Sequence, residues 1–163
     1  MSASRADNVL VLGLGNTLLA DDGVGVHVVR RLTSDAATPP WVRAVEGGTL
    51  GFHLTGFLSG TSDVLIIDAA DIAEPAGTIR LLDGRLLSDR VASGDRTSAH
   101  EAGLAALLCV VRLESLMLRN LAVLAIQPQT IEWGERLSDA VENAIAPACA
   151  IAQSIVIDWR CNK

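Results

Sequence analysis

The stretch VLGLGNTLLADDGVGVHVVRRL, residues 11–32, decides how this chain folds. An apolar run typical of a buried strand ends in glycines, passes two adjacent aspartates, Asp21 and Asp22, and continues with apolar residues on one helical face. The order of strand, glycine-rich turn and helix is typical of α/β proteins. The acidic pair is unusual at this place, because adjacent carboxylates repel a phosphate at the start of a helix.

The rest of the chain continues to alternate between strand and helix patterns. Apolar runs and turn residues predict strands over 8–14, 41–46, a run ending near Asp68, 77–83 and 121–127, and helices over 22–32, 50–59, 100–113 and from Leu137 onward. Only residues 69–76 separate the third strand from the fourth, which is too short for a parallel crossover, so an antiparallel fourth strand is expected. Residues 84–98 are polar and rich in Gly and Ser, which predicts a loop.

These elements predict a single domain over residues 1–163 with an α/β fold. We expect a three-layer sandwich in which a mostly parallel five-stranded sheet, with one short antiparallel strand, is flanked by helices on both faces. A chain of this length can bury roughly 70% of its unfolded surface, and 50% of its residues are hydrophobic. Aromatic residues make up only 3%, so the core is expected to be aliphatic, as in buried parallel strands.

Charge and cysteine content argue against several classes of function. The formal net charge is −6 and no long basic run occurs, so we expect no nucleic-acid partner. The three cysteines, Cys109, Cys149 and Cys161, show no CxxC spacing and are expected to be reduced thiols. The sequence shows no secretory leader pattern and no window of about 18 uncharged apolar residues. We therefore expect a cytoplasmic protein without a membrane span.

Three candidate functional residues, Asp22, Asp68 and His100, are expected at one edge of the sheet, where ligands bind beyond the carboxyl ends of the strands. Asp22 alone could be a helix cap. A carboxylate such as Asp68, at the end of an apolar strand, is costly to bury without partners. The field at a helix start keeps the ring of His100 neutral, which is the form that binds metals. Together, two oxygens and one nitrogen suit a divalent transition-metal ion.

Other chemistries fit the sequence less well. A dinucleotide-binding turn requires a third glycine where Leu18 stands, and no G-x-S-x-G nucleophile motif occurs. The cysteines occupy apolar helix positions or the C-terminal tail, where packing is expected. His27 and His53 fall on predicted amphipathic helices, so a structural role is expected for both.

The motifs together resemble those of the hydrogenase maturation proteases. The matching blocks, in order between about residues 8 and 155, are LGLGNTLLADDGVG, EGGTLG, LIIDAAD, PAGT, HEAGLAALL, IQPQ and LSDAVENA. Proteins of that family are endopeptidases that trim the C-terminal tail of the large subunit of [NiFe]-hydrogenase. The resemblance covers nearly the whole predicted domain and implies the same activity for this chain.

The resemblance also implies roles for individual residues. The metal ligands and catalytic residues of the family fall on Asp22, Asp68 and His100. The substrate-binding loop of the family falls on Gly47, Gly48 and Thr49, where glycines allow a close approach of substrate backbone. In this interpretation Asp21 is a cap, or a support that positions Asp22.

Nickel, in this interpretation, arrives already bound in the partner, the large-subunit precursor of a [NiFe]-hydrogenase. The three ligands would bind or sense that nickel, and another divalent ion such as cadmium could occupy the site in vitro. Water would attack the peptide bond, polarised either by the metal or by a carboxylate acting as base. Cleavage only after nickel insertion would make proteolysis a checkpoint of assembly, performed by an enzyme expected to be a monomer.

Three alternatives remain at this point. A non-catalytic, nickel-sensing chaperone of the large subunit would need the same ligands. The GLGN turn also resembles peptidyl-tRNA hydrolase, but the Pro-Gly that follows it and the Arg-His-Asn block of that family are missing. A nucleotide-binding α/β protein is the third alternative.

Overall fold

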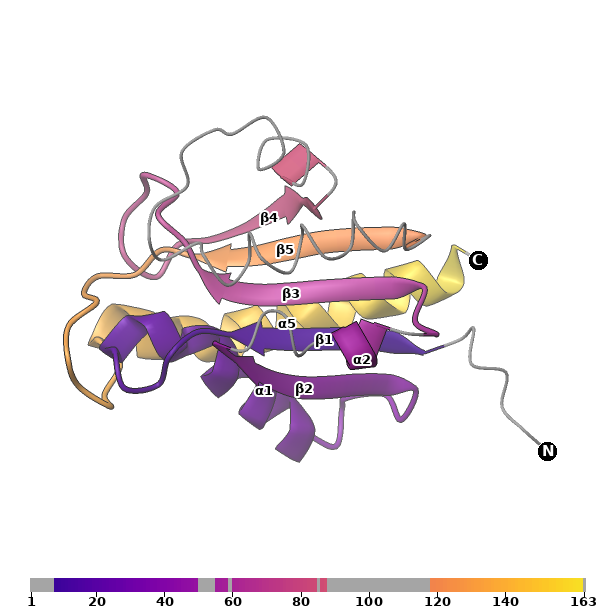
Figure 1. Ribbon diagram of the computed structural model, residues 1–163, viewed down its shortest axis with the longest axis horizontal. Helices are drawn as coiled ribbons and strands as arrows, with labels where there is room; N and C mark the ends of the chain where they lie inside the picture. The colour runs from indigo at the N-terminus through magenta and orange to yellow at the C-terminus, as the bar shows by residue number, and fades with distance from the viewer. Residues whose placement is uncertain (1–7, 50–54, 59, 85, 88–117, 163) are drawn as a thin grey trace.

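The structure of this protein is a computed structural model, and it describes residues 8–49, 55–58, 60–84, 86–87 and 118–162. Within them, five strands form one sheet in the order β2-β1-β3-β5-β4. These strands are β1 (Val9–Leu14), β2 (Val42–Gly48), β3 (Asp63–Ala69), β4 (Ile79–Asp83) and β5 (Asn120–Ile126). The first three and β5 run parallel, whereas β4 pairs antiparallel with β5 at one edge (Figure 1). The mixed sheet and the antiparallel fourth strand were both predicted from the sequence, and both are confirmed.

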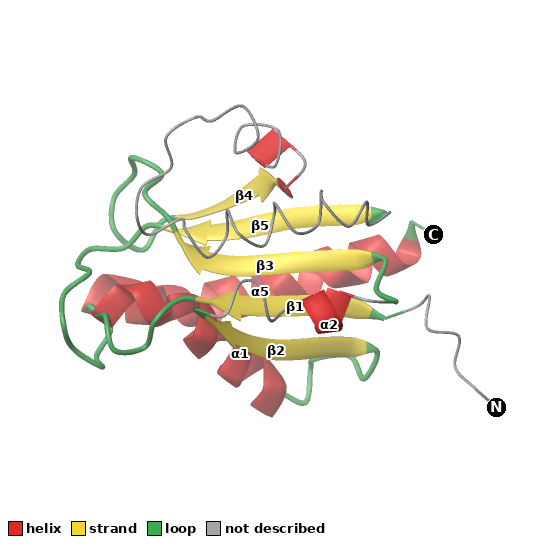
Figure 2. Ribbon diagram, in the orientation of Figure 1, coloured by secondary structure: helices red, strands yellow, loops and turns green. Residues whose placement is uncertain are grey.

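Helices lie on both faces of the sheet, as predicted (Figure 2). The helices α1 (Val24–Ser34) and α5 (Asp139–Cys161) contact each other and cover one face. The short helix α2 (Thr55–Leu58) lies over the opposite face. The helix expected over residues 100–113 lies outside the described residues.

The core consists of two aliphatic clusters, one on each face of the sheet. In β1, Val9 and Val11 belong to the cluster under α1 and α5, whereas Leu10, Leu12 and Leu14 belong to the cluster that contains Leu58 of α2. Both faces of β1 are therefore buried, as expected for a central parallel strand. Each fully buried side chain of this size contributes about 1.5–3 kcal/mol relative to an exposed one.

Several predicted strand ends differ from the structure by one or two residues, and two further differences concern helices. The first helix was expected from Asp22, but residues Ala20–Gly23 form a separate 3-10 turn, η2, and α1 begins only at Val24. The loop predicted over 84–98 is wrong at its start, because Gly84, Leu86 and Leu87 are helical. Leu87 packs against the second core cluster, which a polar composition could not indicate.

The helix α5 is long and apolar enough to cross a membrane by length and composition. In the fold, however, it buries one face against α1 and the sheet through small and aliphatic residues, among them Val141, Ala148, Ala152 and Val156. About a third of its apolar window (33%) is buried in this way, and a single helix of such length and composition is weak evidence for a membrane span. Cys149 lies in this interface as a free thiol, and burial raises its pKa, in agreement with the predicted packing role.

Candidate active site

The candidate site lies at the edge of the sheet where β1, β2, β3 and β5 end. Three segments that are distant in the sequence meet there: residues 15–23 after β1, residues 47–49 at the end of β2, and residues 127–138 after β5 (Figure 1). The backbone N–H of Gly15 donates a hydrogen bond to the carbonyl of Gly48 (3.0 Å), and that of Ala20 donates to the carbonyl of Gly134 (2.7 Å). The edge is therefore a connected backbone structure rather than a set of separate loops.

Two glycines allow the turn after β1 to fold this tightly. Gly15 has φ +115°, and a Cβ atom there would lie 1.8 Å from the carbonyl oxygen of Asp22. Gly25, in the first turn of α1, would place a Cβ atom 2.1 Å from the carbonyl oxygen of Ile67. Only glycine fits either position, and the result is that α1 starts directly against the end of β3.

Asp22 occupies η2 and is 8% exposed. Its Oδ2 atom accepts a hydrogen bond from the backbone N–H of Asn16 (2.7 Å). Its second oxygen, Oδ1, accepts no hydrogen bond from the described residues. The carboxylate is thus held by one oxygen while the other remains available to a ligand.

Asp68 lies one residue before the end of β3 and is 3% exposed. The carbonyl oxygen of the preceding residue, Ile67, lies against Gly25 in the first turn of α1. The turn η2, which carries Asp22, also contacts β3. Asp22 and Asp68 therefore lie on elements that contact each other at the same edge of the sheet, and their roles as ligands stay a prediction. His100, the third predicted ligand, lies outside the described residues, and so does His53.

Asp21 is fully buried and fixes η2 to the segment after β5. Its carboxylate accepts hydrogen bonds from the backbone N–H groups of Gln129 (2.9 Å), Thr130 (3.1 Å) and Ser138 (2.7 Å), and from the hydroxyl of Ser138 (2.8 Å). Burial alone would raise the pKa of Asp21, but these hydrogen bonds outweigh it and hold the pKa below its ordinary value. The support role expected for Asp21 thus takes the form of a bridge between two segments.

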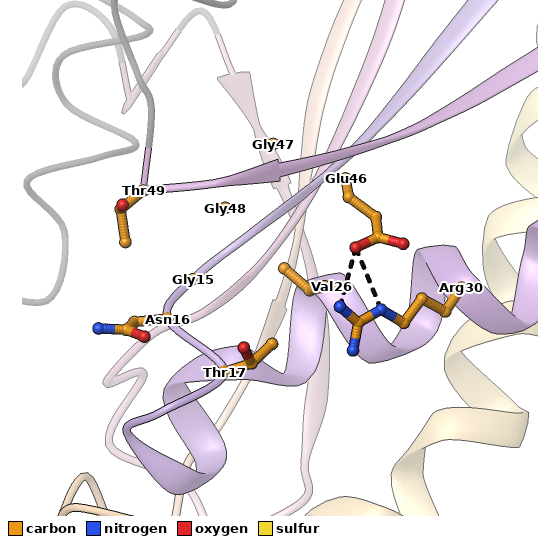
Figure 3. A pocket seen from close by; sticks show the side chains of 9 residues that line it. All are labelled: Gly15, Asn16, Thr17, Val26, Arg30, Glu46, Gly47, Gly48 and Thr49. Carbon is orange, nitrogen blue, oxygen red and sulfur yellow. Dashed lines mark hydrogen bonds and ion pairs between the residues drawn. The ribbon is translucent and has the colours of Figure 1, made fainter. Parts of the chain in front are cut away.

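The segment Gly47–Thr49 lines a cavity of about 260 Å³ beside this edge (Figure 3). The pairing of β1 with β2 is irregular there, because Gly13 pairs with Glu46 and the next residue, Leu14, pairs with Gly48. Gly48 has φ +53°, and a Cβ atom built on it would contact nothing. The backbone at Gly48 therefore faces open space, whereas Gly47 beside it is buried.

An ion pair in the same cavity could not be predicted from the sequence. The guanidinium of Arg30, on α1, donates from Nε (3.1 Å) and from Nη2 (3.0 Å) to one oxygen of Glu46, at the end of β2 (Figure 3). Both side chains are about half-exposed, and both line the cavity with Asn16 and Thr17. The sequence signal was limited to the position of Glu46 at a strand end, since nothing indicated that Arg30 would face it.

Gln127, near the edge, has a structural role. The side chain of Gln127, which ends the fifth predicted strand, accepts a hydrogen bond from the backbone N–H of Ile72 (2.8 Å) and holds the β3–β4 connection. His27, on α1, has a buried Nε2 without a hydrogen-bond partner among the described residues, and burial lowers its pKa. Among the described residues, no group of three His, Cys, Asp or Glu side chains could hold a metal ion.

Comparison with known proteins identifies the family. The model of the hydrogenase maturation protease family (HycI) matches residues 26–155. The chain belongs to the hydrogenase maturation protease family. Its homologues are maturation proteases, so it is a protease and hence a hydrolase.

Two known proteins are similar to this hydrogenase maturation protease, one in sequence and one in fold. The Hydrogenase 2 maturation protease of Escherichia coli K12 is 31% identical over 141 residues, which cover 86% of this chain and 85% of that protein. The hydrogenase maturating endopeptidase HybD from E. coli has the same fold, with a TM-score of 0.81 and 28% identity over 93% of both chains.

An archaeal neighbour extends the comparison. The [NiFe] hydrogenase maturation protease HybD from Thermococcus kodakarensis superposes with a TM-score of 0.73 and 28% identity, covering 91% of this chain and 99% of that one. Both solved structures thus support the same fold for this maturation protease over most of its length.

Proposed function

We propose that this protein is the endopeptidase that removes the C-terminal tail of the nickel-loaded large-subunit precursor of a [NiFe]-hydrogenase. The observation that carries the proposal is the pair of buried carboxylates, Asp22 and Asp68, at one sheet edge of a chain that belongs to this protease family. Burying a charged carboxylate is costly, and a cation bound by both groups would lower that cost.

The nickel ion of the precursor is the recognition signal in this proposal, and it is part of the substrate. Asp22 would bind it through Oδ1, since Oδ2 is occupied by the N–H of Asn16. Asp68 and His100 would complete a site of two oxygens and one nitrogen, a donor set suited to a divalent transition ion. Other divalent ions such as cadmium would occupy the same ligands in vitro.

The segment Gly47–Thr49 would hold the peptide that is cut. It lines the cavity together with Asn16, whose backbone N–H binds Asp22, and Gly48 leaves space for a close approach of substrate backbone. The attacking group would be water, activated by the metal or by one of the carboxylates. Positioning the peptide against a fixed metal supplies much of the rate enhancement in such a reaction.

A processing assay tests this proposal. Nickel-loaded precursor is incubated with the wild-type protein and with Asp22→Asn, Asp68→Asn and His100→Ala, and the released tail is identified by mass spectrometry. We expect release by the wild-type protein and at least a 100-fold slower release by each variant. Asp158→Asn, which changes an exposed carboxylate near the C-terminal end of α5, away from the proposed ligand set, is the matched control and should retain wild-type activity.

Circular dichroism and thermal unfolding of each variant separate a loss of chemistry from a loss of structure. If the wild-type protein forms a nickel-dependent complex with the precursor but releases no tail, the protein is a non-catalytic, nickel-sensing chaperone. If folded His100→Ala protein processes the precursor at the wild-type rate, His100 is not part of the site.

A further inference from the structure

Two large apolar side chains project into solvent next to the candidate site. Leu18, in the turn after β1, is 46% exposed, and Trp133, in the segment after β5, is 82% exposed. Two backbone hydrogen bonds join the two segments. The N–H of Gly134 donates to the carbonyl of Leu18 (3.0 Å), and the N–H of Ala20 donates to the carbonyl of Gly134 (2.7 Å). We call Leu18 and Trp133 together the apolar pair.

The segment that carries Trp133 is held firmly in this exposed position. The buried carboxylate of Asp21 binds its two ends, at residues 129–130 and at Ser138, and an isolated β-bridge joins Leu19 to Gly134. Ala20 has φ +48°, a conformation that non-glycine residues rarely adopt. The fold therefore fixes a tryptophan in solvent rather than packing it, although only three tryptophans occur in the chain.

The apolar pair continues the surface of the candidate site. Leu18 directly follows Asn16 and Thr17, which line the cavity beside Gly47–Thr49. The side-chain oxygen of Asn16 accepts a hydrogen bond from the backbone N–H of Leu18 (3.0 Å). The backbone N–H of Asn16 donates a hydrogen bond to the carboxylate of Asp22. The apolar pair therefore lies beside the cavity, within reach of a macromolecule whose peptide enters it.

The cavity alone is too small to account for recognition of a protein substrate. Its volume of about 260 Å³ holds only a few side chains, whereas a stable protein–protein interface buries roughly 800 Å² on each partner. Exposed aromatic side chains on a rigid support are typical centres of such interfaces, and tryptophan is enriched among the residues that dominate their binding energy.

We propose that the apolar pair is a docking surface for the folded body of the large-subunit precursor, separate from the groups that bind the nickel and the tail. This inference rests on the proposed function, since it takes the precursor as the protein that enters the site. Two exposed carboxylates, Glu132 and Glu135, flank Trp133. The complementary patch on the precursor should accordingly be apolar with basic side chains at its rim.

The experiment measures binding and cleavage separately. Equilibrium binding of nickel-loaded precursor is measured by titration calorimetry for the wild-type protein, Trp133→Ala, Leu18→Ser and Trp133→Phe, and tail release is followed in parallel. Ile157→Ala, on α5, removes an apolar side chain of similar exposure (43%) and is the matched control. Thermal unfolding verifies that each variant is folded.

We expect Trp133→Ala to weaken binding about 30-fold, as for an interface residue of this kind, and Leu18→Ser to weaken it about tenfold. Trp133→Phe should retain most of the affinity, and Ile157→Ala should bind as the wild type does. In cleavage, Trp133→Ala should raise KM and leave kcat within about twofold, because the pair contributes equally to the ground and transition states.

The outcomes distinguish this inference from the proposed function. Unchanged affinity in folded Trp133→Ala and Leu18→Ser overturns the docking surface and leaves the endopeptidase assignment intact. Nickel-dependent binding that requires Trp133, without tail release by the wild-type protein, overturns the endopeptidase and supports the docking surface. If light scattering shows that the pair instead joins two copies of this chain, and Trp133→Ala yields a monomer with full precursor affinity, the inference is also overturned.

Discussion

Replacing the buried carboxylate of Asp21 measures how strongly the site edge is held together. The carboxylate accepts four hydrogen bonds from a segment more than 100 residues further along the chain. A hydrogen bond to a charged group contributes about 1.5–3 kcal/mol, so four independent ones would contribute roughly 6–12 kcal/mol. They share one carboxylate, however, and burying its charge costs several kcal/mol. The N–H of exposed Gln129 can also bind water after the substitution.

We therefore expect Asp21→Asn to lower the free energy of unfolding by about 2–4 kcal/mol at pH 7. The effect should depend on pH, because the pKa of Asp21 in the folded protein lies below its ordinary value. The stabilisation by a carboxylate with a lowered pKa is fully present above about pH 4 and is lost as the pH falls through the folded-state pKa. The wild type and Asp21→Asn should thus converge in stability at acidic pH.

Urea unfolding of both proteins at several pH values between 7 and 3 measures this difference, with Glu132→Gln as an exposed control. The reasoning is refuted if Asp21→Asn costs less than about 1 kcal/mol at pH 7, or if its cost stays constant down to pH 3. A loss of tail release that follows the loss of stability would show that Asp22 depends on the bridge made by Asp21.

Four further predictions concern the site itself. Gly15→Ala should destabilise the protein by more than about 3 kcal/mol, measured by thermal unfolding, because its Cβ would overlap the carbonyl of Asp22. Asp22→Asn and Asp68→Asn should bind cadmium at least tenfold more weakly in calorimetry while keeping the wild-type circular dichroism spectrum. Glu46→Gln should change the free energy of unfolding by less than about 1 kcal/mol, since its ion pair is half-exposed, and should raise KM in the processing assay. Nickel affinity, measured by calorimetry, should fall below about pH 6 as His100 becomes protonated, and a pH-independent affinity would remove His100 from the ligand set.

Much of the fold followed from local patterns in the sequence. The buried strand β1 is an uninterrupted apolar run, and β3 has an apolar run over 64–67 between two aspartates. The antiparallel pairing of β4 follows from the short connection before it, which no parallel crossover could span. The 3-10 turn at Ala20–Gly23 did not follow, because it depends on a backbone bond to Gly134 and on the buried position of Asp21. These contacts join segments that are more than 100 residues apart, and no periodicity in the chain reports them.

The candidate site also has a part that could be predicted from the sequence and a part that could not. Asp22 and Asp68 could be placed at the same edge of the sheet from the sequence, since parallel strands end at one edge. The pairing of Arg30 with Glu46 and the exposure of Leu18 beside Trp133 could not be predicted, because they depend on the orientation of α1 and of the segment after β5. A sequence indicates which residue types lie at an edge of the sheet, but the packing between helices, strands and loops decides which of their side chains remain exposed to solvent.

The most direct test of the account compares nickel-loaded and nickel-free precursor in the presence of the wild-type protein, with the mass of the large subunit measured before and after incubation. The account predicts that the nickel-loaded precursor alone loses the mass of its C-terminal tail. Equal tail loss from both forms would contradict the central claim that Asp22 and Asp68 bind the nickel as the signal for cleavage.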